Sequence, residues 1–154
     1  METQNILVPY NFTEIDQRAL DFVVRTYSNR TDSTITLLHI YVPLPKIETD
    51  STTVMGRLTS SMHYLAGELN EKEKDLDKAK QYLLERGFSE KQVNHRFIPR
   101  SKQIAEEIIE IAQKDRYEVV VLNCRPYRIT RAFVQSVHSK VIAALRNVAV
   151  CIVT

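Results

Sequence analysis

Four short runs rich in Ile, Val and Leu constrain the fold of this chain more than any other feature of its sequence. The runs are continuous rather than alternating, which is typical of strands buried on both faces of a sheet. They span residues 5–8, 34–42, 118–122 and 148–153, and a weaker, more polar run spans 92–98. Helical patterns separate these runs. The alternation predicts an α/β fold, an open, doubly wound parallel sheet of five strands with helices on both faces.

The size and composition of the chain fit a single domain, residues 1–154. Of its 154 residues, 44% are hydrophobic and 26% are charged, which suits a soluble chain with a core of its own. The longest apolar runs are far shorter than a membrane span, and the first residues lack the pattern of a signal peptide. Two cysteines are too few for a disulfide framework. We therefore expect a cytoplasmic protein that does not bind a membrane.

Charge and motif content exclude several classes of function. Twenty-one Lys and Arg residues are balanced by 19 Asp and Glu residues, which leaves +2 and no broad basic surface for nucleic acid. No two of the 4 histidines have the spacing of metal ligands. The sequence also lacks a glycine-flanked serine, a Gly-Lys-Ser/Thr phosphate loop and a defensible carboxylate pair. We expect no nucleic-acid partner, no metal and no enzymatic activity.

The helix expected between the second and third strands differs from the other helices. From about residue 57 to residue 86, its apolar side chains alternate in steps of four and three, which gives a long narrow seam. Two interpretations are open, one edge of the domain's own core and a coiled-coil contact, and we favour the first. Residues 43–56 are polar and rich in threonine and predict a flexible connector. The seam consists of Leu58, Met62, Leu65, Leu69, Leu76, Ala79 and Leu83, with Lys72 interrupting.

A ligand site in such a sheet lies beyond the carboxyl ends of the strands. In this chain those ends are the segments 9–13, 41–45, 99–101 and 123–131. The first segment leads into a helix that Thr13 is expected to cap, with Asp16 three residues later in a capping-box arrangement.

Several segments resemble, in their order and spacing, the universal stress protein family. They are ILVPYNFT at 6–13, RAL at 18–20, LLHI at 37–40, IIEIA at 108–112, YEVVVL at 117–122 and SV at 136–137. The resemblance covers nearly the whole chain. It implies the strand order 3-2-1-4-5 of an adenine nucleotide alpha hydrolase-like sheet, and a role in stress response or signalling. It also implies a homodimer formed through the fifth strand, Val148 to Val153.

Nucleotide-binding members of that family share a Gly-x2-Gly-x9-Gly-Ser/Thr loop after the fourth strand, and this chain departs from that pattern. The matching positions are Asn123, Pro126 and Gln135, followed by Ser136, and only eight residues separate Pro126 from Gln135. Glycines let backbone amides approach phosphate oxygens closely, whereas a proline has no amide to donate. We therefore expect no cofactor and no ordinary binding of ATP.

The end of the site that holds the base in this family is partly retained. The acidic residue that the nucleotide binders carry two places after the first-strand proline is Asn11 here, and its amide can still hydrogen-bond a purine edge. Pro9 and Ile40 match apolar positions that line the family's adenine pocket. The alternative prediction is a small-ligand-binding module that takes ATP, AMP or another small anion in a variant mode.

Three arginines, Arg125, Arg128 and Arg131, follow the fourth strand at every third residue. Guanidinium groups bind phosphate or carboxylate without a tight backbone turn. A solvated loop whose arginines pair with nearby carboxylates is the other interpretation of the cluster, and we favour it. The residues expected to bind a ligand in the variant mode are Pro9, Asn11, Ile40, Asn123, Arg125, Arg128 and Ser136, with Arg96 and Arg100 near the same rim.

Cys124, at the tip of the fourth strand beside Arg125, has two interpretations. A thiol next to a guanidinium can lose its proton more easily and react with oxidants. The other interpretation, which we favour, is a small hydrophobic side chain packed at a strand end. Cys151 and the histidines, including His39 within its apolar strand, are expected to be structural.

Overall fold

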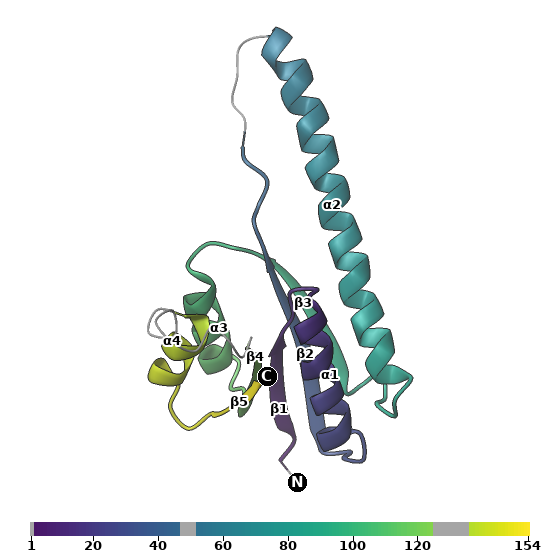
Figure 1. The fold of residues 1–154 in the computed structure, drawn as a ribbon, viewed down its shortest axis with the longest axis vertical. Coiled ribbons are helices and arrows are strands. Elements are labelled where there is room, and N and C mark those ends of the chain that lie inside the picture. The colour runs from purple at the N-terminus through teal and green to yellow at the C-terminus, as the bar shows by residue number, and fades with distance from the viewer. Residues whose placement is uncertain (1, 47–51, 125–135) are drawn as a thin grey trace.

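The computed structural model describes residues 2–46, 52–124 and 136–154, with the backbone alone for 52–57. Its five strands form one parallel sheet in the order β3-β2-β1-β4-β5, which confirms the predicted fold and strand order (Figure 1). The elements are β1 (Gln4–Pro9), α1 (Glu14–Tyr27), β2 (Ser33–Tyr41), α2 (Thr52–Leu84), β3 (Val93–Pro99), α3 (Ile104–Lys114), β4 (Val119–Asn123), α4 (Val137–Ala144) and β5 (Ala149–Val153).

The core is divided by the sheet into two layers. Side chains alternate between the faces of a strand, so Ile6 and Val8 of β1 pack under α1 and α2 while Leu7 packs under α3 and α4. The apolar runs of β1, β2 and β4 are buried because both faces are covered. The prediction of burial on both faces is wrong for the run 148–153, because β5 lies at an edge of the sheet and none of its residues is fully buried. In Figure 1, α1 and α2 lie on one side of the sheet and α3 and α4 on the other, so the fold is doubly wound.

Helix α2 is longer than the sequence predicts and begins earlier. Residues 52–56, expected in the connector, are helical, because propensity penalties of about 1 kcal/mol for Gly56 and less for threonine are too small to stop a helix from extending. The rest of the connector, 47–51, lies outside the described residues. The prediction of the connector is therefore wrong at its C-terminal end.

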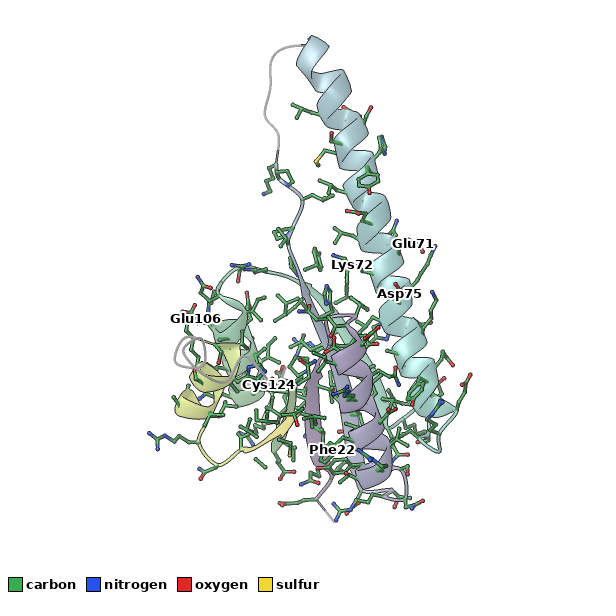
Figure 2. All side chains as sticks on the ribbon, viewed as in Figure 1. Phe22, Glu71, Lys72, Asp75, Glu106 and Cys124 are labelled. Atoms are coloured by element: carbon green, nitrogen blue, oxygen red, sulfur yellow. The ribbon has the colours of Figure 1, made fainter. Side chains whose placement is uncertain are left out.

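Only the C-terminal part of the α2 seam belongs to the core. Leu76, Ala79 and Leu83 are buried against the sheet, whereas Leu65 is 37% exposed and no seam residue described before Leu76 is fully buried. The helix runs well past the carboxyl edge of the sheet, and its side chains there stand clear of the crowded core (Figures 1 and 2). The interpretation of the α2 seam as one edge of the core is therefore confirmed only for about the last two turns of the helix.

No helix in the described part of the chain is both long enough and apolar enough to cross a membrane.

Candidate functional site

A cavity of about 180 Å³ lies beyond the carboxyl ends of β1, β2 and β4. From β1 the chain adds β2 and β3 on one side of the sheet, and it then returns to add β4 and β5 on the other side. The cavity lies between β1 and β4, where the strand order reverses, which is the usual position of a ligand site in an open sheet. Its walls are largely aliphatic, with polar residues contributed by the first loop, α1, β4 and α4. The aliphatic wall includes Leu38, Ile40, Ile104, Ile108, Leu122 and Val137.

Four of the predicted site residues line this cavity, namely Pro9, Asn11, Ile40 and Asn123. They come from three strand ends, which the parallel register of the sheet brings to one edge. Ser136 does not line the cavity, but it caps α4, and its hydroxyl oxygen accepts the Ser139 amide at 3.3 Å. Arg125 and Arg128, together with Arg131, Pro126 and Gln135, lie outside the described residues.

Asp16 forms the polar end of the cavity and is 1% exposed. One carboxylate oxygen, Oδ2, accepts the backbone amide of Asn11 at 3.1 Å and both the amide and the hydroxyl of Thr13 at 2.8 Å each. The amide contact with Thr13 is the half of the predicted capping box that fixes the start of α1. Phe12, between these two residues, has a φ of 61°, and the carboxylate holds the loop in this strained conformation from both sides.

Asn123 connects Asp16 to α4. Its side-chain amide donates to the other carboxylate oxygen of Asp16, and its backbone carbonyl accepts from Nε2 of His138. The chain Asp16–Asn123–His138 therefore joins the start of α1, the end of β4 and the first turn of α4 beneath the cavity. Asn123 is one of the residues expected to bind a ligand, and its side-chain amide donates to Asp16 within the protein.

The prediction that Arg96 and Arg100 converge on this rim is wrong. Arg96 lies in the middle of β3, opposite Leu38, and its guanidinium donates to the carboxylate of Asp115 at 2.5 Å. Asp115 follows α3, at the amino edge of the sheet. Arg100 lies just after β3, but its Nε donates to the backbone carbonyl of Lys102 at 3.0 Å, and it lines a separate surface groove.

Sequence reasoning missed three residues with polar side-chain groups that line the cavity, Tyr10, Asp16 and His138. The capping-box pattern predicts only a helix-capping role for Asp16, and in the structure its side chain also lines the cavity. His138 follows the α4 cap by two residues, a position on the first turn that points back toward the carboxyl edge. Ile104 and Ile108 of α3 also line the cavity and were not predicted as site residues.

His39 and Cys124 have environments that fit structural roles. Nδ1 of His39 lies 2.8 Å from the Tyr10 carbonyl and must donate to it, and its ring contacts Phe12 and Phe97. Burial lowers the pKa of His39, and the hydrogen bond to Tyr10 opposes that shift. Cys124 is buried in the interior at the end of β4 (Figure 2), and its amide donates to the Val153 carbonyl at 2.8 Å.

The lining of the cavity combines aliphatic walls with a few polar groups. Among the described residues that line the cavity, Asp16 is the one carboxylate, and it already accepts four hydrogen bonds. No group of three metal-ligating side chains occurs within the ranges that the structure describes. Aliphatic walls with a polar group at one end are typical of a pocket that holds a flat apolar group and orients its polar edge.

Three solved structures of universal stress proteins are similar to this chain in fold. UspA from Lactobacillus plantarum is similar at 16% identity and a TM-score of 0.66, covering 100% of this chain and 99% of that chain. A universal stress protein from Archaeoglobus fulgidus in complex with dAMP is 16% identical, with a TM-score of 0.64 and full coverage of both chains, each 100%. A universal stress protein in complex with cAMP is 13% identical, with a TM-score of 0.65, covering 99% and 98%.

These structural likenesses concern the fold. A search of curated proteins finds no significant match. The family model described as the universal stress protein family matches residues 2–151, nearly the entire sequence. The chain belongs to the universal stress protein family.

Proposed function

We propose that this protein is a non-enzymatic, cytoplasmic domain of stress response or signalling that does not bind ATP in the ordinary way. The observation that carries the proposal is the composition of the segment after β4, where Asn123, Pro126 and Gln135 stand at the positions of the nucleotide-binding glycines. Without glycine, and with one amide missing at Pro126, this segment is unsuited to wrap its backbone around a polyphosphate.

The first loop supports the same proposal. The backbone amides of Asn11 and Thr13 lie at the N-terminus of α1, where an anion is normally favoured. Both donate to Asp16 at 3.1 and 2.8 Å. Because the chain's own carboxylate occupies these donors, a phosphate group has no free amide at either of these two positions.

Isothermal titration calorimetry with Mg-ATP and with AMP tests this proposal. We expect no saturable heat at micromolar ligand. A saturable isotherm with either nucleotide in that range would contradict it, and a thermal melt of the same preparation establishes that the protein is folded.

The proposed domain is a homodimer formed through residues 148–153. In the sheet β5 pairs with β4 alone and lies at an edge, and Ile152 is 37% exposed there. An uncovered edge strand with apolar side chains tends to pair with another strand.

A second candidate is a module that binds a nucleotide or another small anion in a variant mode. The cavity itself favours it, since Pro9, Asn11 and Ile40 gather there, and so do the relatives described in complex with dAMP and cAMP. In this mode Arg125 and Arg128 would neutralise the phosphate.

Thermal stabilisation by AMP tests the second candidate. A ligand that binds the folded state raises the melting temperature by mass action, and the Arg125→Ala/Arg128→Ala variant should lose that rise. The variant Arg25→Ala/Arg146→Ala is the matched control, because it removes the same charge from two exposed positions away from the cavity. If AMP raised the melting temperature of the Arg125→Ala/Arg128→Ala variant as much as that of the unmodified protein, these arginines would have no part in binding AMP.

A further inference from the structure

The outer part of α2 carries an apolar stripe, Leu58, Met62, Leu65 and Leu69, that the body of the domain leaves partly uncovered. Leu65 is 37% exposed, and the other three side chains are partly exposed. Among the described residues, neither layer of the core includes any of these four. This part of the helix projects past the carboxyl edge of the sheet (Figures 1 and 2). The α2 stripe therefore faces outward from the core that buries the other end of the helix.

The spacing of the α2 stripe is that of a coiled-coil seam. Its residues recur in steps of four, three and four, so they occupy alternate d and a positions of the heptad pattern. Side chains at these positions follow one edge of a helix and insert between those of a facing helix. The α2 stripe is therefore suited to pair with a single helix.

The α2 stripe matches a second copy of itself when the two helices run in opposite directions. In that arrangement each a position faces a d position, so Leu58 faces Leu69 of the second copy and Met62 faces Leu65 of the second copy. A twofold contact repeats every pair in the reverse sense, which gives four layers. All four layers are apolar, and the whole stripe is used.

Charged residues beside the stripe oppose the parallel alignment. Two parallel helices in register would place Lys72, the next position of the seam, against Lys72 of the second copy. They would also bring Glu68 of one helix to Glu73 of the other. Both contacts join like charges. In the antiparallel alignment Lys72 lies beyond the four layers and Glu68 faces the uncharged Ser61, so charge complementarity selects the antiparallel pair.

The antiparallel alignment also keeps the two domains apart. Leu76 is the first residue of the seam that is buried in the core. At 1.5 Å per residue along a helix, the two copies of Leu76 would lie roughly 37 Å apart along the pair. The helices therefore meet through their projecting ends, with the two sheets at opposite ends of the contact.

We propose that the α2 stripe is an interaction surface for a second copy of this chain, which it binds as an antiparallel helix pair. The proposal goes beyond the proposed function and does not depend on it. Helix α2 packs on β2 and β3, whereas β5 lies at the opposite edge of the sheet. One chain can therefore make this contact and the proposed β5 contact at the same time.

The contact is weak because the stripe is short. It spans residues 58–69, fewer than two heptads, whereas a sustained coiled coil has at least three or four. Interfaces of small area belong to transient complexes. We expect association through α2 at about 0.5 mM protein and little of it at micromolar concentration.

Light scattering over a concentration series tests the proposal. The mass of the unmodified protein should rise to about twice its micromolar value as the concentration approaches about 0.5 mM. Leu65→Glu places a charge within the seam and should keep the micromolar mass throughout. Tyr64→Glu is the matched control, because Tyr64 is 68% exposed and lies beside the stripe but outside it, and this variant should associate like the unmodified protein. Thermal melts followed by circular dichroism establish that all three proteins are folded.

Disulfide trapping tests the direction of the two helices. The variants Leu58→Cys and Leu69→Cys, both carrying Cys151→Ser, are treated with a mild oxidant separately and as an equal mixture, and the remaining Cys124 is buried. Only the antiparallel pair brings residue 58 of one copy within disulfide distance of residue 69 of the other. A denaturing gel should show covalent dimer in the mixture and at least about tenfold less from either variant alone.

Each outcome bears on the α2 contact alone. A mass that stays constant up to the highest concentration would overturn the proposal, and so would an equal rise in Leu65→Glu. Covalent dimer formed as readily by either cysteine variant alone would overturn the antiparallel alignment. Neither measurement depends on Mg-ATP, and Ile152→Lys tests the β5 contact while leaving α2 unchanged, so failure here is distinct from failure of the proposed function.

Discussion

The side-chain amide of Asn123, at the end of β4, donates a hydrogen bond to the carboxylate of Asp16, which lies 107 residues earlier in α1. The two residues meet because β1 and β4 are neighbours in the sheet although they are far apart in the sequence. With His138 bonded to the carbonyl of Asn123, the contact ties both halves of the doubly wound sheet together at the edge where the cavity opens.

Loss of the Asp16 carboxylate should destabilise the whole domain. Asp16→Ala leaves the amides of Asn11, Thr13 and Asn123 without their acceptor. A lost cap and unpaired, partly buried donors together cost about 2–4 kcal/mol. Urea denaturation followed by circular dichroism measures the change in the free energy of unfolding. Glu14→Ala, at an exposed position in the same turn, should change that free energy by about 0.5 kcal/mol or less, and an equal loss in both variants would argue against a specific role for Asp16.

Glu107 should make stability depend on acidic pH. Its carboxylate, at the start of α3, accepts the amide and hydroxyl of Ser101 at 2.7 and 2.8 Å and the Lys102 amide at 3.0 Å. The hydrogen bonds from Ser101 are the largest of the effects that lower the pKa of Glu107 below its ordinary value of 4.5. The unfolded chain thus takes up the proton first as the pH falls. This contribution to stability is complete above the ordinary pKa and is lost as the pH falls through the lower, folded value.

The comparison of Glu107→Gln with the unmodified protein isolates this effect. The glutamine keeps an acceptor oxygen but does not titrate in this range. Chemical denaturation at neutral pH and at successive values below the ordinary glutamate pKa should show a shallower loss of stability in the variant. Glu106→Gln is the control, since Glu106 is the exposed neighbour, and it should follow the unmodified protein.

Replacement of Arg116 by glycine should stabilise the protein. Arg116 follows α3 with a φ of 54°, a left-handed conformation that costs most side chains energy and costs glycine none. Its side chain is exposed, so Arg116→Gly removes strain without removing packing and should raise the free energy of unfolding by about 1 kcal/mol. Thermal and urea denaturation measure this change in the free energy of unfolding. Asn147→Gly, at a φ of 58°, should raise it less, because asparagine tolerates this conformation better.

A lysine on the β5 edge should prevent dimerisation. Ile152→Lys places a charge on the edge strand, where charged side chains block pairing with another strand. Light scattering at micromolar concentration should give a dimer mass for the unmodified protein and a monomer mass for this variant. Ile142→Lys makes the same change at an exposed position of α4 and should remain dimeric. A monomer mass for the unmodified protein would contradict the proposed assembly.

The sequence predicts the sheet well because local signals suffice for it. The run Val119–Leu122 is apolar throughout, as strands covered on both faces must be, and the helix start at Thr13 depends on residues within one turn. The beginning of α2 at Thr52 escapes prediction because the preferences of single residues there are weaker than the tendency of a helix to extend.

The candidate site is predicted only in part because it depends on long-range contacts. Pro9 and Asn11 follow from the rule that ligands gather at strand ends. The engagement of Asp16 with Asn123 does not, since nothing local at either residue indicates the other. The predicted position of Arg96 near the rim is wrong for a similar reason. Its bond to Asp115 depends on the packing of α3 beside β3, which no local pattern indicates.

The extension of α2 beyond the sheet has a consequence for the dynamics of the domain. Its backbone hydrogen bonds near Leu58 and Met62 are held by the helix itself, whereas those near Leu76 and Leu83 are also locked by the core. Local opening can therefore begin at the projecting end without disrupting the sheet. Amide hydrogen exchange along this one helix should slow by orders of magnitude from its outer end to its inner end.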